Sequence, residues 1–179
     1  SLVEASEKGD LNKVQQLLDS GADLNVEDYA NHTALYHAAE KGHFNIAKLL
    51  LEKGAKVNHE SGDSALLWAC HYGHVDIVKL LIENGANVNA KRSMDDSTPL
   101  SFAVHRNHKE IVELLLEKGA DANVANQHGE TALDRSKPET VAILRKHGGK
   151  TGEDLGAKPW NWKEMETVAR ELLGTYEWK

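Results

Sequence analysis

Residues 148–152, "GGKTG", could do chemistry, because a Gly-Lys-Thr triplet can bind the phosphates of a nucleotide. A phosphate loop of the Walker type also needs a glycine five positions before the glycine of that triplet, but position 144 is Leu144. No strand of β-branched residues precedes the stretch. The preceding "TVAILRKHG" instead favours a helix with Pro138 near its start and Gly148 just past its end. We therefore interpret the glycines as the end of a helix.

The ten histidines and 28 acidic residues raise the question of a metal or catalytic site. His43, His74 and His108 lie 31 and 34 residues apart, at matching places in a repeat described below, which indicates a repeated structural role. The sequence has no His-x3-His, no paired cysteines and no Gly-x-Ser-x-Gly. Cys70 precedes His71, but we expect a buried structural thiol at this position. We predict no catalytic residue, cofactor or metal, and hence no enzyme.

The composition limits the possible partners and compartments. A net charge of -7 over 179 residues disfavours nucleic acid and anionic membranes as partners. The longest apolar runs have three or four residues, and residues 1–30 lack the apolar core of a signal peptide. A single cysteine fits a reducing compartment, although a processed secreted protein would look the same. We expect a cytoplasmic protein that is monomeric when free.

Two phrases alternate along the chain, and they indicate two helices per repeat. "LLDSGADLN" returns as "LLEKGAKVN", "LIENGANVN" and "LLEKGADAN", with glycines 33, 31 and 34 residues apart. Between them lie "TALYHAAEKGH", "SALLWACHYGH", "TPLSFAVHRNH" and a reduced "TALDRS". Such a unit has apolar residues on both flanks, so neighbouring units must stack to bury them.

Each unit carries its own start and stop signals. We predict that Thr33, Ser64, Thr98 and Thr131 each cap the start of a first helix, which buries a leucine and an alanine such as Leu35 and Ala38. A second helix follows, for example over residues 45–53, with an apolar stripe at Ile46, Leu49 and Leu50. Gly54, Gly85 and Gly119 then take the left-handed conformation that ends it.

These phrases resemble those of the ankyrin-repeat family over about five units, residues 1–149. The resemblance implies an all-α solenoid of stacked helix-turn-helix units, with β-hairpin-like fingers beside a concave groove. The family's "TPLH" histidine is replaced by Tyr36, Leu67, Ser101 and Asp134, which puts its local hydrogen bond in doubt.

The resemblance also implies a partner site on the finger tips and on the last two residues of each first helix. Carried over by position, the candidate residues are Tyr29, His32, Glu40, Lys41, Asp63, His71, Tyr72, Met94, Asp95, His105, Arg106 and His128, with Trp68 close behind them.

We expect the middle of this strip to be the centre of the site, because Tyr, Trp, Arg and Met are enriched at interface centres. The alternative is that these are ordinary surface residues, and the position of Trp68 normally faces the adjoining helix. If His71 and His105 line the groove, the affinity for a partner should change between pH 5 and 8.

Residues 150–179 form a linker and a predicted amphipathic helix that starts near Asn161 and ends near Gly174. Such a short helix needs a surface to dock on. One possibility is that it packs on the last unit as a cap. The alternative is that it binds a partner, or folds along the groove and blocks it. Its candidate contact residues are Trp160, Trp162, Met165, Leu172, Tyr176 and Trp178.

Three functions remain open from the sequence. The first is a non-catalytic module of the adaptor, inhibitor or immunity type, which binds another protein through its groove and fingers. The second is a regulatory or small-ligand-binding module that the aromatic C-terminal helix gates. The third is a fragment of an enzyme whose chemistry lies outside this chain.

Overall fold

The described part of the chain is a row of short helices. The structure, a computed structural model, describes residues 1–58 and 64–156. The helices in these ranges are α1 (Leu2–Lys8), α2 (Leu11–Asp19), α3 (Ala34–Lys41), α4 (Phe44–Glu52), α5 (Ala65–Tyr72), α6 (Val75–Glu83), α7 (Pro99–His105), α8 (Lys109–Glu117) and α9 (Pro138–Lys146). None of them has the length and apolar character that a membrane crossing requires.

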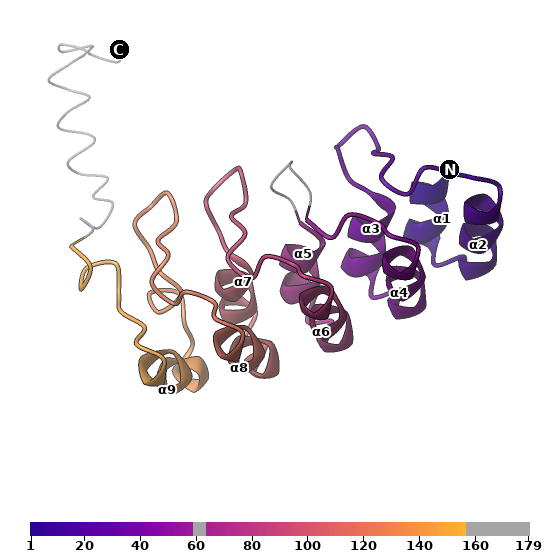
Figure 1. Cartoon of the computed structure of the whole chain (residues 1–179). Helices are drawn as coiled ribbons and strands as arrows, with labels where there is room; N and C mark the ends of the chain where they lie inside the picture. The colour runs from indigo at the N-terminus through magenta and orange to yellow at the C-terminus, as the bar shows by residue number, and fades with distance from the viewer. Residues whose placement is uncertain (59–63, 157–179) are drawn as a thin grey trace, which may run out of the picture.

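The helices stack as antiparallel pairs, as the sequence predicted. The inner helices α1, α3, α5 and α7 pack against one another in order, and α2, α4, α6 and α8 form the outer row (Figure 1). The loops between pairs project to one side. They form a first finger (residues 22–33), a third finger (86–98) and a fourth finger (120–131), while the second finger contains residues 59–63, outside the described part. The expected all-α solenoid is confirmed.

The predicted helix signals act as expected in three units. The hydroxyls of Thr33, Ser64 and Thr98 each accept a hydrogen bond from the backbone N–H three residues on, at 3.2–3.3 Å. Behind these caps, the predicted core leucines and alanines are buried. Cys70 is also completely buried, and this burial raises the pKa of its thiol, which confirms the prediction of a structural cysteine.

The last unit differs from the prediction, because Thr131 does not start an α-helix. Residues 132–135 form a turn, and the Thr131 hydroxyl lies 2.6 Å from the carbonyl oxygen of Lys150. The reason is the nearby Pro138. Lys137, which precedes this proline, must be extended (φ -86°, ψ 158°), so too few residues remain for an inner helix. The Asp134 carboxylate accepts from the Thr131 backbone N–H at 2.8 Å and from the Thr131 hydroxyl at 2.9 Å, so this hydroxyl donates instead of accepting a cap hydrogen bond.

The "GGKTG" stretch packs on this last unit. Gly148, with φ 79°, ends α9 as predicted. The Asp134 carboxylate accepts a hydrogen bond from the Gly152 backbone N–H at 2.6 Å, and a Cβ at Gly152 would overlap the carbonyl oxygen of Gly129. The stretch therefore follows a helix rather than a strand, and glycine allows the backbone to approach the fourth finger closely.

Repeated asparagines join each unit to the next. Each Oδ1 of Asn25, Asn58, Asn89 and Asn123 accepts from a backbone N–H in the following unit at 2.8–2.9 Å. For the last three, Nδ2 also donates to the carbonyl oxygen of the glycine that ends the outer helix of the next unit, at 2.9–3.2 Å; these are Gly85, Gly119 and Gly148, respectively. These bonds explain why the sequence repeats an asparagine after each Gly-Ala phrase.

Repeated histidines make a second connection between units. The Nε2 atoms of His43, His74 and His108 can each donate to a backbone carbonyl oxygen in the inner helix of the preceding unit, at 3.0–3.2 Å. The carbonyls belong to Glu7, Glu40 and His71, respectively. The predicted structural role of these histidines is confirmed.

These contacts predict that two similar glycines tolerate alanine differently. Gly42 and Gly54 both have a positive φ (79° and 93°), so alanine strains the backbone at both. A Cβ at Gly42 would lie 2.7 Å from the His74 ring, whereas nothing lies within 4 Å of a Cβ at Gly54. We expect Gly42→Ala to lower the free energy of unfolding by about 1 kcal/mol more than Gly54→Ala, because it also displaces the His74 hydrogen bond. Urea denaturation of both variants measures the difference; equal losses would show that this bond contributes little.

Candidate partner-binding groove

The candidate residues lie at the ends of the inner helices and on the fingers. Because α3, α5 and α7 pack side by side, their last turns form a row, with Glu40 and Lys41 on the first, His71 and Tyr72 on the second, and His105 on the third. Arg106 follows directly as the C-cap residue of α7.

At the middle of this row lies a central aromatic cluster, formed by Trp68, His71, Tyr72 and Phe102. The Trp68 ring centroid is 5.3 Å from that of His71 and 6.1 Å from those of both Tyr72 and Phe102. The His71 and Phe102 rings are 5.3 Å apart and meet edge to face, an attractive arrangement. Tyr72 is 49% exposed, so the cluster reaches the surface.

Two arginines join this cluster from different segments. The Arg92 guanidinium, from the third finger, lies 5.6 Å from the Trp68 centroid and 5.9 Å from that of Phe102, within the range of a cation–π interaction. Arg106 comes from the end of α7, and its guanidinium is 2.7 Å from Nε2 of His71. The guanidinium can only donate, so Nε2 accepts and His71 is neutral.

The surroundings of His71 and His105 oppose their protonation. Burial and the positive charge of Arg106, with smaller effects from His105, His108 and Arg92, lower the pKa of His71. Burial, then Arg135, Arg106 and Lys137, lower the pKa of His105. The centre of the row is thus locally rich in positive charge, although the whole chain carries -7.

The remaining described candidates lie on the fingers. Met94 is 71% exposed on the third finger, with its sulfur 3.4 Å from the Arg92 guanidinium. Asp95 lies 3.7 Å from the same guanidinium, and its carbonyl oxygen accepts from Gln127 of the fourth finger at 3.1 Å. Tyr29 and His128 are exposed on the first and fourth fingers. Asp63 and the predicted C-terminal helix lie outside the described residues.

The sequence analysis missed Arg92 and Phe102. Phe102 lies four residues after the cap Thr98, as Trp68 does after Ser64 and His37 does after Thr33, so the repeat itself marks this position. No comparable signal identifies Arg92, because its position depends on the path of the third finger.

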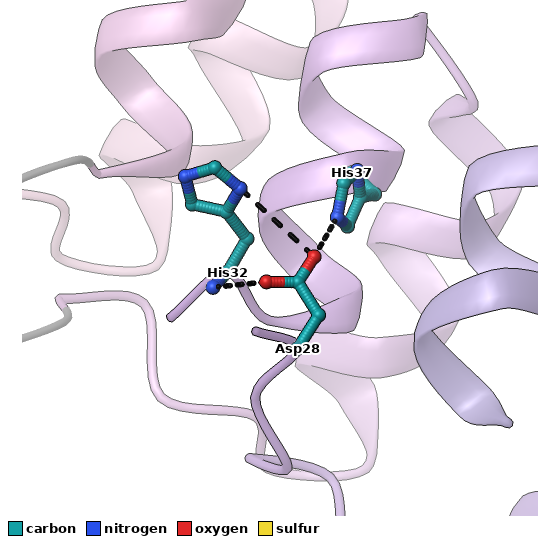
Figure 2. Close-up of side chains that lie close together, drawn as sticks. All are labelled: Asp28, His32 and His37. Carbon is teal, nitrogen blue, oxygen red and sulfur yellow. Dashed lines mark hydrogen bonds and ion pairs between the residues drawn. The ribbon is translucent and has the colours of Figure 1, made fainter. Parts of the chain in front are cut away.

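A second group of polar side chains lies at the base of the first finger. The sequence analysis named His32 as a candidate partner residue but missed Asp28 and His37. Figure 2 shows the Asp28 carboxylate between the rings of His32 and His37. Its Oδ2 atom is 2.8 Å from Nε2 of His37 and 4.0 Å from Nδ1 of His32. Burial raises the pKa of Asp28, but hydrogen bonds from His37 and from the backbone N–H groups of His32 and Ala30 outweigh this effect and lower it to about 2.

Comparison with known families supports the sequence interpretation. The profile for ankyrin repeats (3 copies) matches residues 2–92, and the profile for ankyrin repeats (many copies) matches residues 92–135. A search of curated proteins finds no significant match.

The position of His71 predicts how stability depends on pH. Because its pKa is lowered in the folded state, the unfolded chain takes up the proton first, and stability falls as the pH drops below about 6.5. We expect His71→Gln to lose less stability than the wild type between pH 7.5 and pH 5, measured by urea denaturation at each pH. His147→Gln, at the exposed end of α9, controls for removing a histidine. An unchanged pH dependence in His71→Gln would contradict this account.

Proposed function

Because the chain belongs to the ankyrin-repeat family, whose repeats generally act as protein–protein interaction modules, we propose that it binds a protein partner through the central aromatic cluster and the adjacent fingers. It acts without catalysis, as an adaptor, an inhibitor or an immunity-type partner. The observation that carries the proposal is the aromatic cluster, with Arg92 and Arg106 beside it, in the middle of an otherwise polar row.

The residue types support an interface centre here. Trp, Tyr and Arg dominate the binding energy of measured interfaces, and Met is also enriched there, whereas Lys and Glu are depleted. On one side of this centre the row carries Glu40 and Lys41, and the neighbouring fourth finger carries His128. An apolar centre within a polar rim is typical of interfaces that exclude water from a few strong contacts.

The side chains at the centre are already held in place, which favours binding. Arg106 is fixed by His71, and Arg92 lies over two rings and beside Asp95. Side chains that are ordered before association lose less conformational entropy when a partner arrives. The repeats around them are joined by the asparagine and histidine bonds, so the backbone is ordered as well.

The charge of the centre favours a particular kind of partner surface. Arg92 and Arg106 lie beside the aromatic rings, and Arg135 adds positive charge near His105. Guanidinium groups bind carboxylates through two parallel hydrogen bonds. We therefore expect the partner to present acidic side chains next to an apolar or aromatic one. Since the pKa values of His71 and His105 are lowered, both side chains gain charge only below the usual range of histidine, and the affinity should change on acidification through that lower range.

The alternative is a regulatory or small-ligand-binding module gated by the C-terminal helix. This alternative depends on the predicted C-terminal helix, which lies outside the described ranges, so the test of function must compare chains with and without it. A chain truncated after Gly156 separates the two proposals, because it retains the groove and lacks the predicted helix.

The test is affinity capture from a lysate of the source organism, followed by measurement of the dissociation constant for the captured protein. The double variant Tyr72→Ala, Arg106→Ala removes two exposed side chains of the centre. We expect it to weaken binding at least tenfold, because one interface hot spot contributes about 2 kcal/mol or more and each 1.4 kcal/mol is a factor of ten. The matched control Phe44→Ala, Lys48→Ala removes an aromatic and a cation from α4, in the outer row, and should bind within about twofold of the wild type.

Circular dichroism and urea denaturation establish that each variant is folded. Equal affinity of the folded groove variant and the control would contradict the proposed site. If truncation after Gly156 abolishes binding while the groove variant retains it, the contact lies in the C-terminal segment. If the intact chain captures no protein, a small ligand becomes the better proposal.

A further inference from the structure

We propose that Asp28, His32 and His37 form a binding site for a divalent transition-metal ion, with Zn²⁺ as the best fit, at the base of the first finger. The proposal does not depend on the proposed function. Within residues 1–58 and 64–156, these side chains form the one group of three or more His, Cys, Asp or Glu residues whose ligand atoms lie within 4.8 Å of one another.

The geometry is close to that of a metal site. Bonds of about 2.0–2.1 Å in a tetrahedral zinc site place the ligand atoms about 3.3 Å apart. Here the Asp28 oxygen is 2.8 Å from the His37 nitrogen and 4.0 Å from the His32 nitrogen. The two dashed lines in Figure 2 that start at the imidazole rings converge on this one oxygen. Shifts of about 1 Å or less would bring these three atoms onto one ion.

The first finger fixes the carboxylate before any ion arrives. The other carboxylate oxygen, Oδ1, accepts hydrogen bonds from the backbone N–H groups of Ala30 at 2.8 Å and His32 at 3.0 Å. This leaves Oδ2 facing the two rings. Asn31, with φ 62°, makes the tight turn that returns the chain from Asp28 to His32. The finger therefore holds two of the three ligands in one short loop.

The two rings are also held in position. The His32 ring stacks on Tyr36, with centroids 3.8 Å apart and planes within 4°. The Nδ1 atom of His37 is buried without a hydrogen-bond partner, and the nearest carboxylate oxygen, from Glu40, is 3.6 Å away. In metal sites, the second nitrogen of a ligating histidine usually donates to a carboxylate, which fixes the ring and strengthens the ligand. Glu40 is placed for this role.

The donor set selects the class of ion. Two imidazoles and one carboxylate suit Zn²⁺ and its neighbours among the transition metals, whereas Ca²⁺ and Mg²⁺ prefer sites made of oxygen. Three protein ligands leave a fourth position for water. The side chains of Asp28, His32 and His37 are 28%, 20% and 11% exposed, so an ion can reach them from solvent.

The test is calorimetric titration of the metal-free full chain with ZnCl₂, together with the visible spectrum after addition of Co²⁺. We expect one ion per chain, bound with micromolar affinity or better, d–d bands of a tetrahedral or five-coordinate Co²⁺, and reversal by EDTA. His32→Ala should weaken Zn²⁺ binding at least tenfold. Asp28→Asn should do the same, and it retains an oxygen that can accept both backbone hydrogen bonds of the finger.

The control is His128→Ala, which removes an exposed histidine from the fourth finger and should bind Zn²⁺ like the wild type. Circular dichroism verifies that all variants are folded. The proposal is overturned if the wild type binds no Zn²⁺, or if His32→Ala and Asp28→Asn bind it as tightly as the wild type. In either case the three side chains form only a hydrogen-bonded group that fixes the finger.

Discussion

The stacking of one helix pair on the next is the constraint on which the rest of the structure depends. A pair this short cannot bury its apolar flanks alone, so the core runs continuously from unit to unit. The same register brings each repeated asparagine and histidine to backbone groups of a neighbouring unit, where they satisfy donors and acceptors. Stacking therefore fixes the residue type at these positions. It does not fix the side chains at the finger tips or in the last turns of the inner helices.

The proposed site lies where these two kinds of position meet. The backbone carbonyl of His71 faces the structural His108, while its side chain accepts from Arg106 and contacts Trp68 and Phe102. His71 thus belongs both to the stacked framework, through its backbone, and to the proposed site, through its side chain. A rigid framework that holds aromatic and guanidinium groups in fixed places can recognise a partner surface without first ordering itself.

The two ends of the described chain use the repeat differently. On α3, below the first finger, His37 occupies the position that Trp68 and Phe102 occupy in later units, and besides the rings of His32 and Tyr36 it contacts the Asp28 carboxylate. The last unit has no inner helix, because Pro138 starts the outer helix early. Gly152 instead packs closely against the fourth finger. A different residue at one repeated position therefore gives an aromatic centre in the middle units and a polar group of three side chains at the first finger. A proline gives the last unit its different structure.

The sequence by itself determined the repeat, the helix caps, the left-handed glycines and the structural role of His43, His74 and His108. These features depend on contacts within one unit or on contacts that recur at every unit, so a single chain shows them several times. Only the tertiary structure decided that Arg92 reaches the rings of Trp68 and Phe102, and that Asp28 lies between His32 and His37. Those contacts depend on the path of individual fingers, which occurs once and leaves no period in the sequence. The missing inner helix after Thr131 has a different cause, because a local restriction at Lys137 and Pro138 overrides the repeated pattern.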